Sequence, residues 1–211
     1  MPAQLQLALD GDLSNALHIL KAAAPHIDIV EAGTPLIYRE GVRALAALRQ
    51  HFAGQLLADL KIMDAGAEES GIGFAAGADW VTVLAVTQNR TISGAVQAAR
   101  DSSGRVMADM MQVSDPVSRA HELLALGCDM LCVHTAFDQQ STGGSPLETL
   151  RRLREALPNA PLAVAGGISS DNLSALLAYR PQIVVVGGAI TRHASPATAA
   201  QTLQNIIRNF E

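Results

Sequence analysis

Charged side chains in this chain collect directly after short apolar runs. Asp10 follows one such run, Glu31 ends a second, and Asp59, Lys61 and Asp64 lie in and after a third. A lysine held among carboxylates stays cationic and can stabilise an oxyanion as it forms. These residue types therefore point to chemistry that develops negative charge on a small substrate.

Two further polar residues follow later apolar runs, Asp109 in VMADMM and His134 in LCVHTAFD. A histidine can accept or deliver a proton near neutral pH. A single aspartate at a strand end often caps the next helix instead, and a single histidine is often structural. The whole set favours a site, because each ionised group buried in a barrel is costly unless it is paired or binds a metal.

Glu31 and Asp59 are candidates for a cation site. They belong to consecutive apolar runs, so in a parallel sheet their carboxylates can converge on one ion. Oxygen ligands without His or Cys suit Mg²⁺, which needs few protein carboxylates and keeps some waters; Mn²⁺ is the alternative.

Two glycine pairs, Gly166-Gly167 and Gly187-Gly188, follow the last two apolar runs. Loops at these places in many eight-stranded barrels present backbone N–H groups to a phosphate, and glycine allows close approach. Glycine pairs also occur in tight turns. The prediction of a phosphate site therefore depends on the position of these pairs after the last two expected strands.

The elements that must position these residues repeat along the chain. Short apolar runs alternate with amphipathic stretches, which predicts strands alternating with helices. The expected strands are Leu5–Leu9, Ile27–Ala32, Leu56–Leu60, Trp80–Leu84, Arg105–Ala108, Met130–Val133, Leu162–Ala165 and Ile183–Val186. Eight such units favour an α/β protein with a (β/α)8 TIM barrel over an open parallel sheet. Without a linker or composition shift, residues 1–211 are predicted to form one domain.

Helix boundaries carry the expected signals. Asp115 and Ser195 each precede a proline, which favours an N-cap followed by a first helical turn. Gly77, Gly104 and Gly127 lie where helices should end, and each is predicted to adopt a left-handed C-cap conformation.

Composition excludes several classes of protein. The net charge of −5 leaves no basic surface for nucleic acid. The sequence contains no run of 18 apolar residues, so we expect no membrane span. The N-terminus also lacks the features of a signal peptide. Cys128 and Cys132 are expected to be core thiols rather than a disulfide or metal pair. These absences lead us to expect a cytoplasmic protein.

The motifs resemble a known family. LADLKIMDAG with LALD before it is similar to the orotidine monophosphate decarboxylase suprafamily, and DIVEAGTPLI, ADMMQV, LCVHTAFDQQ, AVAGGI and VVVGGAI narrow the resemblance to the 3-hexulose-6-phosphate synthases. The similarity runs from Leu5 to about Ile190. It implies an aldehyde-lyase of the ribulose monophosphate pathway, which condenses formaldehyde with D-ribulose 5-phosphate through an enediolate to D-arabino-hex-3-ulose 6-phosphate, with Mg²⁺.

The resemblance also implies roles for individual residues. Glu31 and Asp59 would hold the metal, Lys61 would face the enediolate, and His134 would move protons. Asp10 and Asp109 would support this network and contact substrate hydroxyls. Asp64 would enter the neighbouring subunit's site, making a homodimer the catalytic unit. Gly166, Gly167, Gly187 and Gly188 would hold the phosphate.

Three other functions are alternatives to the synthase activity. The related 3-keto-L-gulonate-6-phosphate decarboxylase carries arginine where this chain has Phe137 and Gly188, and glutamate in place of Asp109, whereas Ile62 is a residue it tends to share. A non-catalytic sugar-phosphate sensor would usually lose the charged groups that are present here. Ribulose-phosphate 3-epimerases use a pair of metal-binding histidines that the second and third expected strands lack.

Overall fold

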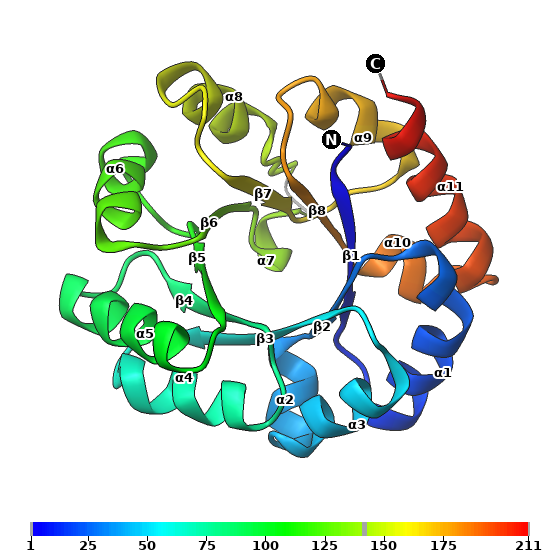
Figure 1. The fold of residues 1–211 in the computed structure, drawn as a ribbon. Helices are drawn as coiled ribbons and strands as arrows, with labels where there is room; N and C mark the ends of the chain where they lie inside the picture. The colour runs from blue at the N-terminus through cyan, green and yellow to red at the C-terminus, as the bar shows by residue number, and fades with distance from the viewer. Residues whose placement is uncertain (1, 141–142, 211) are drawn as a thin grey trace.

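Eight parallel strands close into a barrel in the order of the chain. The computed structural model describes residues 2–140 and 143–210. Each strand pairs with the next, and the last pairs with the first (Figure 1). The strands are β1 (Gln4–Leu9), β2 (Ile29–Ala32), β3 (Gln55–Ile62), β4 (Trp80–Leu84), β5 (Arg105–Asp109), β6 (Met130–His134), β7 (Leu162–Ala165) and β8 (Ile183–Val186). The predicted (β/α)8 fold class is confirmed.

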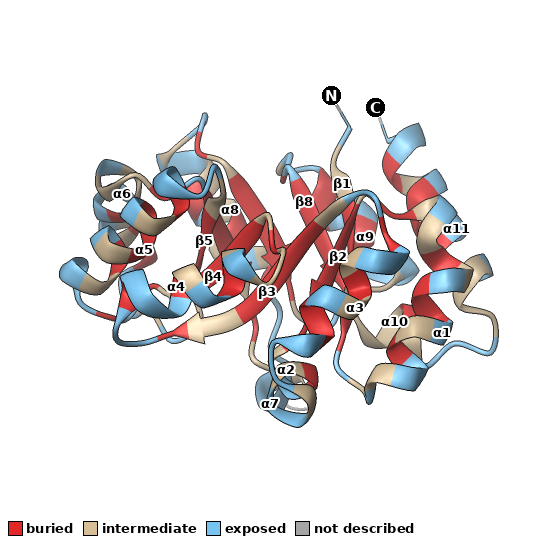
Figure 2. Ribbon diagram, turned by 60° about the horizontal axis from the view of Figure 1, so that its bottom comes forward, coloured by how far each residue is buried: buried red, intermediate tan, exposed pale blue. Residues whose placement is uncertain are grey.

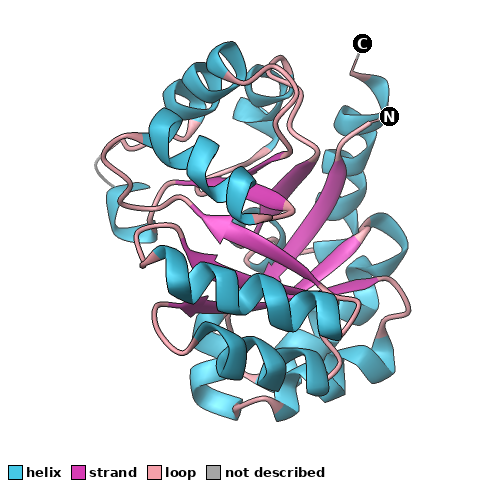
Figure 3. Cartoon of the chain, turned by 60° about the vertical axis from the view of Figure 1, so that its left-hand side comes forward, coloured by secondary structure: helices cyan, strands magenta, loops and turns pink. Residues whose placement is uncertain are grey.

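Helices connect the strands and surround the barrel (Figures 1 and 3). They are α1 (Leu13–Ala23), η1 (Ala24–His26), α2 (Thr34–Glu40), α3 (Arg43–His51), α4 (Gly66–Ala75), α5 (Asn89–Asp101), α6 (Pro116–Leu126), α7 (Phe137–Gln140), α8 (Leu147–Ala156), α9 (Ser170–Leu177), α10 (Gly188–Thr191) and α11 (Pro196–Asn209). The short α7 lies inside the outline of the strand ring in Figure 1. In the described part of the chain, no helix is long and apolar enough to cross a membrane.

The helix-capping predictions hold at four positions and fail at one. Asp115 caps α6 and Ser195 caps α11, while Gly127 and Gly77 have left-handed backbones with φ of 98° and 100°. Gly104 is not left-handed. The preceding Ser103 takes that conformation instead, with φ of 55°. Gly104 lies against the Phe74 ring, which leaves no room for a side chain at this position.

Strand boundaries differ from the sequence prediction mainly in β2 and β3. β2 begins at Ile29 rather than Ile27, because the backbone and side chain of Asp28 are both bonded to Leu5 at the turn. β3 continues beyond Leu60 to Ile62. The extension carries Lys61 into the strand, and this shapes the site described below.

The core has two layers, and the strands are buried on both faces (Figure 2). Most apolar side chains pack between the strands and the helices. A smaller cluster fills the barrel interior, formed by Ile29, Leu57, Trp80, Met107, Met130, Cys132, Ala163, Ala165, Ile183 and Val185. Cys128 and Cys132 are both free and buried, as predicted. This interior packing forms a floor beneath the carboxyl ends of the strands.

Candidate active site

Lys61 lies at the centre of a charged cluster at the carboxyl end of the barrel. Its Nζ is 2.5 Å from Oδ2 of Asp59 and 3.5 Å from Oδ2 of Asp109. His134 contacts Asp109 from the other side, with Nδ1 2.8 Å from Oδ2. Side chains predicted from three separate strand ends therefore meet in one place.

A bulge in β3 brings Asp59 and Lys61 together. Ala58 pairs with Val81, but Ile62 pairs with Val83, so β3 holds two extra residues against β4. Lys61 has a left-handed backbone with φ of 47°, which is uncommon for a side chain of this size. The Asp59 and Lys61 side chains therefore meet through this irregularity rather than through the regular alternation of side chains along a strand.

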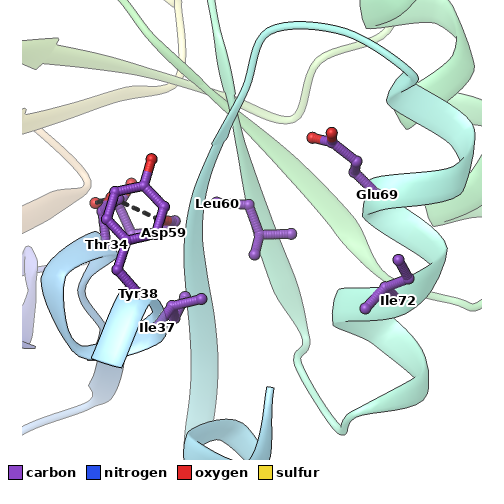
Figure 4. Close-up of a pocket in the computed structure, with 7 residues that line it drawn as sticks. All are labelled: Thr34, Ile37, Tyr38, Asp59, Leu60, Glu69 and Ile72. Atoms are coloured by element: carbon purple, nitrogen blue, oxygen red, sulfur yellow. Dashed lines mark hydrogen bonds between the residues drawn. The ribbon is translucent and has the colours of Figure 1, made fainter. Parts of the chain in front are cut away.

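Thr82 stabilises the bulge, and sequence analysis missed it. Its buried hydroxyl accepts the backbone N–H of Lys61 at 2.9 Å and donates to Oδ1 of Asp59 at 2.8 Å. Thr34 lies on the other side, with its hydroxyl 2.7 Å from Oδ2 of Asp59 (Figure 4). A single hydroxyl in the apolar strand WVTVL was the available signal for Thr82, and a threonine is common enough in strands to pass unnoticed.

Glu31 is buried beside this cluster. Burial and the nearby charge of Asp59 raise its pKa to about 8. Gln6, also absent from the sequence prediction, donates its side-chain amide to Glu31 at 2.5 Å, and its own Oε1 has no partner among the described residues. Nearby protein groups therefore compensate a negative charge on Glu31 poorly, and without a cation this side chain is mainly protonated near neutral pH.

Asp10 completes the acidic side of the mouth. Burial, followed by the charge of Asp59, raises its pKa. Any side chain at Gly33 would overlap the Asp10 carboxylate, so glycine is required there. Arg39 donates to the backbone carbonyl of Asp10 at 2.8 Å, which fixes the end of β1.

Asp109 and Lys61 keep opposite charges. Burial disfavours the Asp109 carboxylate, but the hydrogen bond and charge of His134, together with Lys61, hold its pKa below the usual value. Burial likewise disfavours the Lys61 ammonium, but Asp59 and Asp109 outweigh it and raise its pKa. Lys61 is thus a fixed cation near neutral pH.

The donor set fits a hard divalent cation. Among residues 2–140 and 143–210, no group of three or more His, Cys, Asp or Glu side chains could hold a metal ion. Glu31 and Asp59 nevertheless interact electrostatically, and the unpartnered Oε1 of Gln6 adds an oxygen next to Glu31. Mg²⁺ is commonly bound by a few protein oxygens, with water molecules completing its coordination.

The two glycine pairs differ in geometry. Gly166 and Gly167 are left-handed, with φ of 101° and 67°, and a side chain at Gly166 would overlap the Thr135 carbonyl. Gly187 and Gly188 do not have left-handed backbones. Gly187 follows β8 near Asp10, and Gly188 begins α10. All four lie at the same end of the barrel as the charged cluster.

Within the described residues, Asp64 has no hydrogen bond or ion pair with this cluster. It is exposed, and its Oδ1 accepts the backbone N–H of Ala65 at 2.7 Å. A groove of about 160 Å³ opens between α2 and α4 (Figure 4). Ile37, Tyr38, Leu60 and Ile72 give it an apolar lining, and Tyr38 is 84% exposed.

Fold and site together define an enzyme built on a (β/α)8 barrel. The sequence matches the model of the Orotidine 5'-phosphate decarboxylase / HUMPS family over residues 3–203. The chain belongs to this family.

Relatives with known names narrow the class. The chain is 42% identical over 206 residues to a Bacillus subtilis (strain 168) 3-hexulose-6-phosphate synthase, covering 97% of this chain and 98% of the relative. The Salmonella typhimurium 3-hexulose-6-phosphate synthase structure is 40% identical with a TM-score of 0.95, covering 99% and 100% of the two chains. A Vibrio cholerae 3-keto-L-gulonate-6-phosphate decarboxylase is 27% identical with a TM-score of 0.88, covering 100% of both chains. These relatives support an enzyme of the lyase class with an aldol-type synthase function.

Proposed function

We propose that this enzyme condenses formaldehyde with D-ribulose 5-phosphate to give D-arabino-hex-3-ulose 6-phosphate, with Mg²⁺ (or Mn²⁺) bound. The observation that carries the proposal is the half-buried Lys61 held between Asp59 and Asp109, with His134 on Asp109. This arrangement offers a proton acceptor and a fixed positive charge side by side, which enediolate chemistry needs.

His134 acts as the general base. The carboxylate of Asp109 can only accept a hydrogen bond, so Nδ1 of His134 carries the proton in their 2.8 Å contact. That leaves the lone pair on Nε2 free to take a proton from C1 of ribulose 5-phosphate. Asp109 orients the ring and stabilises the imidazolium that results, as the third group of a catalytic triad does.

Lys61 stabilises the enediolate that remains after C1 loses its proton. The π electrons between C1 and C2 then form one C–C bond to the formaldehyde carbon, the C2 carbonyl re-forms, and the formaldehyde π electrons move to the formaldehyde oxygen. The His134 imidazolium returns a proton to that oxygen. Mg²⁺ bound by Glu31 and Asp59 would supply additional positive charge beside the substrate oxygens.

The loops after β7 and β8 are proposed to hold the phosphate. Gly166 and Gly167 form a left-handed turn after β7, Gly187 and Gly188 lie on the adjacent strand end, and backbone N–H groups of these loops are proposed to bind the phosphate. Formaldehyde is too small to provide much binding energy, so the phosphate and ketose contacts should determine specificity.

A homodimer is proposed as the functional unit, with Asp64 reaching the partner subunit's site. Two features support it. Asp64 is exposed and, within the described residues, has no hydrogen bond or ion pair with the cluster of its own chain. The groove between α2 and α4 also exposes the apolar side chains of Tyr38 and Ile72. Contiguous apolar surface of this kind often marks a protein–protein interface.

Formaldehyde consumption tests the reaction. The enzyme should consume formaldehyde when ribulose 5-phosphate and Mg²⁺ are both present, and EDTA or omission of the ketose phosphate should stop it. No consumption under the complete conditions would overturn the proposal.

The decarboxylase activity is the second candidate, favoured by the Vibrio cholerae relative and by Ile62. The same preparation should be given 3-keto-L-gulonate 6-phosphate and its CO2 release measured. Release much faster than formaldehyde fixation would assign the chain to the decarboxylases, whereas the proposed function predicts the reverse order.

A further inference from the structure

Arg192 lies over the glycine that ends the β8 loop. Its backbone N–H bonds to the Gly188 carbonyl at 3.1 Å, one turn back along α10. Its side chain also folds back: a Cβ added at Gly188 would overlap Nη2 and lie 2.8 Å from Nε and 2.9 Å from Cζ of Arg192. The guanidinium therefore occupies the space that a side chain at residue 188 would fill.

This guanidinium has free hydrogen-bond donors. Within the described ranges, the Arg192 side chain has no hydrogen bond and no ion pair, and it is exposed to solvent. By contrast, Arg39 and Arg154 direct their guanidinium groups to backbone carbonyls of their own chain. A planar group with unused N–H donors suits bidentate binding of a phosphate.

The charge balance of the mouth calls for a cation here. Asp10, Glu31, Asp59 and Asp109 make the opposite side acidic, and the chain carries a net charge of −5. Backbone amides at the glycine loops can donate hydrogen bonds to a phosphate dianion, but they carry no net positive charge. Lys61 is already engaged by two carboxylates.

We propose that Arg192 binds the phosphate of the substrate, through the space that Gly188 leaves open. The inference rests on the proposed function, because it takes the β7 and β8 loops as the phosphate site. It assigns the positive charge to Arg192 itself. A side chain at residue 188 would enter the space that the Arg192 guanidinium fills, so an arginine at either position could carry the charge.

The first test compares Arg192→Ala with the wild type and with Arg90→Ala. Arg90 is an exposed arginine at the start of α5, on the same end of the barrel, so it controls for the loss of one positive charge there. Arg192→Ala should raise the KM for ribulose 5-phosphate roughly 10- to 100-fold, with kcat changed much less. Arg90→Ala should leave both nearly unchanged, and Arg192→Lys should recover part of the loss.

Binding of inorganic phosphate and of ribulose 5-phosphate, measured by calorimetry, separates this inference from the reaction. Weaker binding of both by Arg192→Ala than by wild type supports the role of Arg192 even if no formaldehyde is consumed, an outcome that would overturn only the proposed function. Equal affinities in the two proteins, or no binding by the wild type, would overturn the role of Arg192.

A double variant sharpens the assignment. Gly188→Arg combined with Arg192→Ala moves the guanidinium to the other attachment point and should bind phosphate more tightly than Arg192→Ala alone. No recovery in a double variant with wild-type thermal stability would count against a shared position for the two guanidinium groups.

Discussion

Acidic side chains have different roles at the two ends of the barrel. At the amino end, three aspartates that precede even-numbered strands each accept a backbone N–H from the previous strand. These bonds are Asp28 to Leu5, Asp79 to Leu56 and Asp129 to Val106, each 2.8 Å long. Gln182 bonds to Leu162 in the same way at 2.7 Å. These side chains complete the start of each strand and stabilise the barrel.

At the carboxyl end, the carboxylates lie close to one another and to Lys61 and His134. Asp59 and Asp109 share Lys61, while Glu31 is buried with a raised pKa of about 8. Charges packed in this way are unfavourable for folding unless a ligand completes them. The difference teaches that residue type alone does not separate a structural acid from a functional one; the partner of the carboxylate does.

The largest effect is expected from Lys61→Ala. Losing the fixed cation beside the reacting oxygens should lower kcat/KM for formaldehyde fixation by roughly 10³-fold or more. Lys21→Ala is the matched control, because Lys21 is exposed on α1 and is the other lysine of the chain. Retained activity in Lys61→Ala would show that the cluster at the carboxyl end is not catalytic.

A smaller loss of activity is expected from Thr82→Val, which removes the hydroxyl without changing the side-chain shape much. Asp59 and the Lys61 backbone would each lose a hydrogen bond, so kcat should fall about 10- to 100-fold. Thr82→Ser should recover most of it. Ser70→Ala, at a buried hydroxyl without a partner, is the control and should keep full activity. A normal kcat in Thr82→Val would show that Thr82 does not position Asp59 and Lys61 for catalysis.

Glu31 should make the metal-free protein less stable as the pH rises. Its folded-state pKa of about 8 lies above the ordinary value of 4.5, so its contribution is full below about pH 4.5 and is lost as the pH rises through 8. In EDTA, Glu31→Gln should therefore gain stability relative to wild type across this interval, by several kcal/mol at the upper end. Chemical denaturation at several pH values measures the difference.

Mg²⁺ should reverse that difference. A cation binds the ionised carboxylate, so Mg²⁺ should raise the Tm of the wild type more at pH 8 than at pH 6, and that of Glu31→Gln much less. Equal Mg²⁺ stabilisation of both proteins would place the cation elsewhere.

The smallest effect, on stability alone, is expected at the amino end. Asp79→Ala leaves the Leu56 N–H and the Arg49 guanidinium without their partner and should destabilise the fold by about 1–2 kcal/mol. Its kcat/KM should match wild type. Asp101→Ala, at an exposed aspartate of α5, should change stability by less than about 0.5 kcal/mol. A loss of kcat/KM in Asp79→Ala would blur the distinction between the two ends.

Much of this architecture could be predicted because it repeats. Eight apolar runs indicated the barrel, and polar residues at the run ends indicated the mouth. The bulge in β3 could not be predicted, since it depends on Thr82 from the next strand bonding to the Lys61 backbone. Gln6 was missed because an uncharged side chain within an apolar strand gives little signal. Contacts between strands, rather than patterns within them, account for these gaps.

The most direct test of the proposed chemistry is hydrogen exchange at C1 of ribulose 5-phosphate in D2O, followed by proton NMR without formaldehyde. Wild-type enzyme with Mg²⁺ should replace one C1 proton by deuterium. EDTA should abolish the exchange, and Lys61→Ala should slow it by roughly 10³-fold or more. No exchange by the wild type, or equal rates in wild type and Lys61→Ala, would contradict an enediolate stabilised by Lys61 at this site.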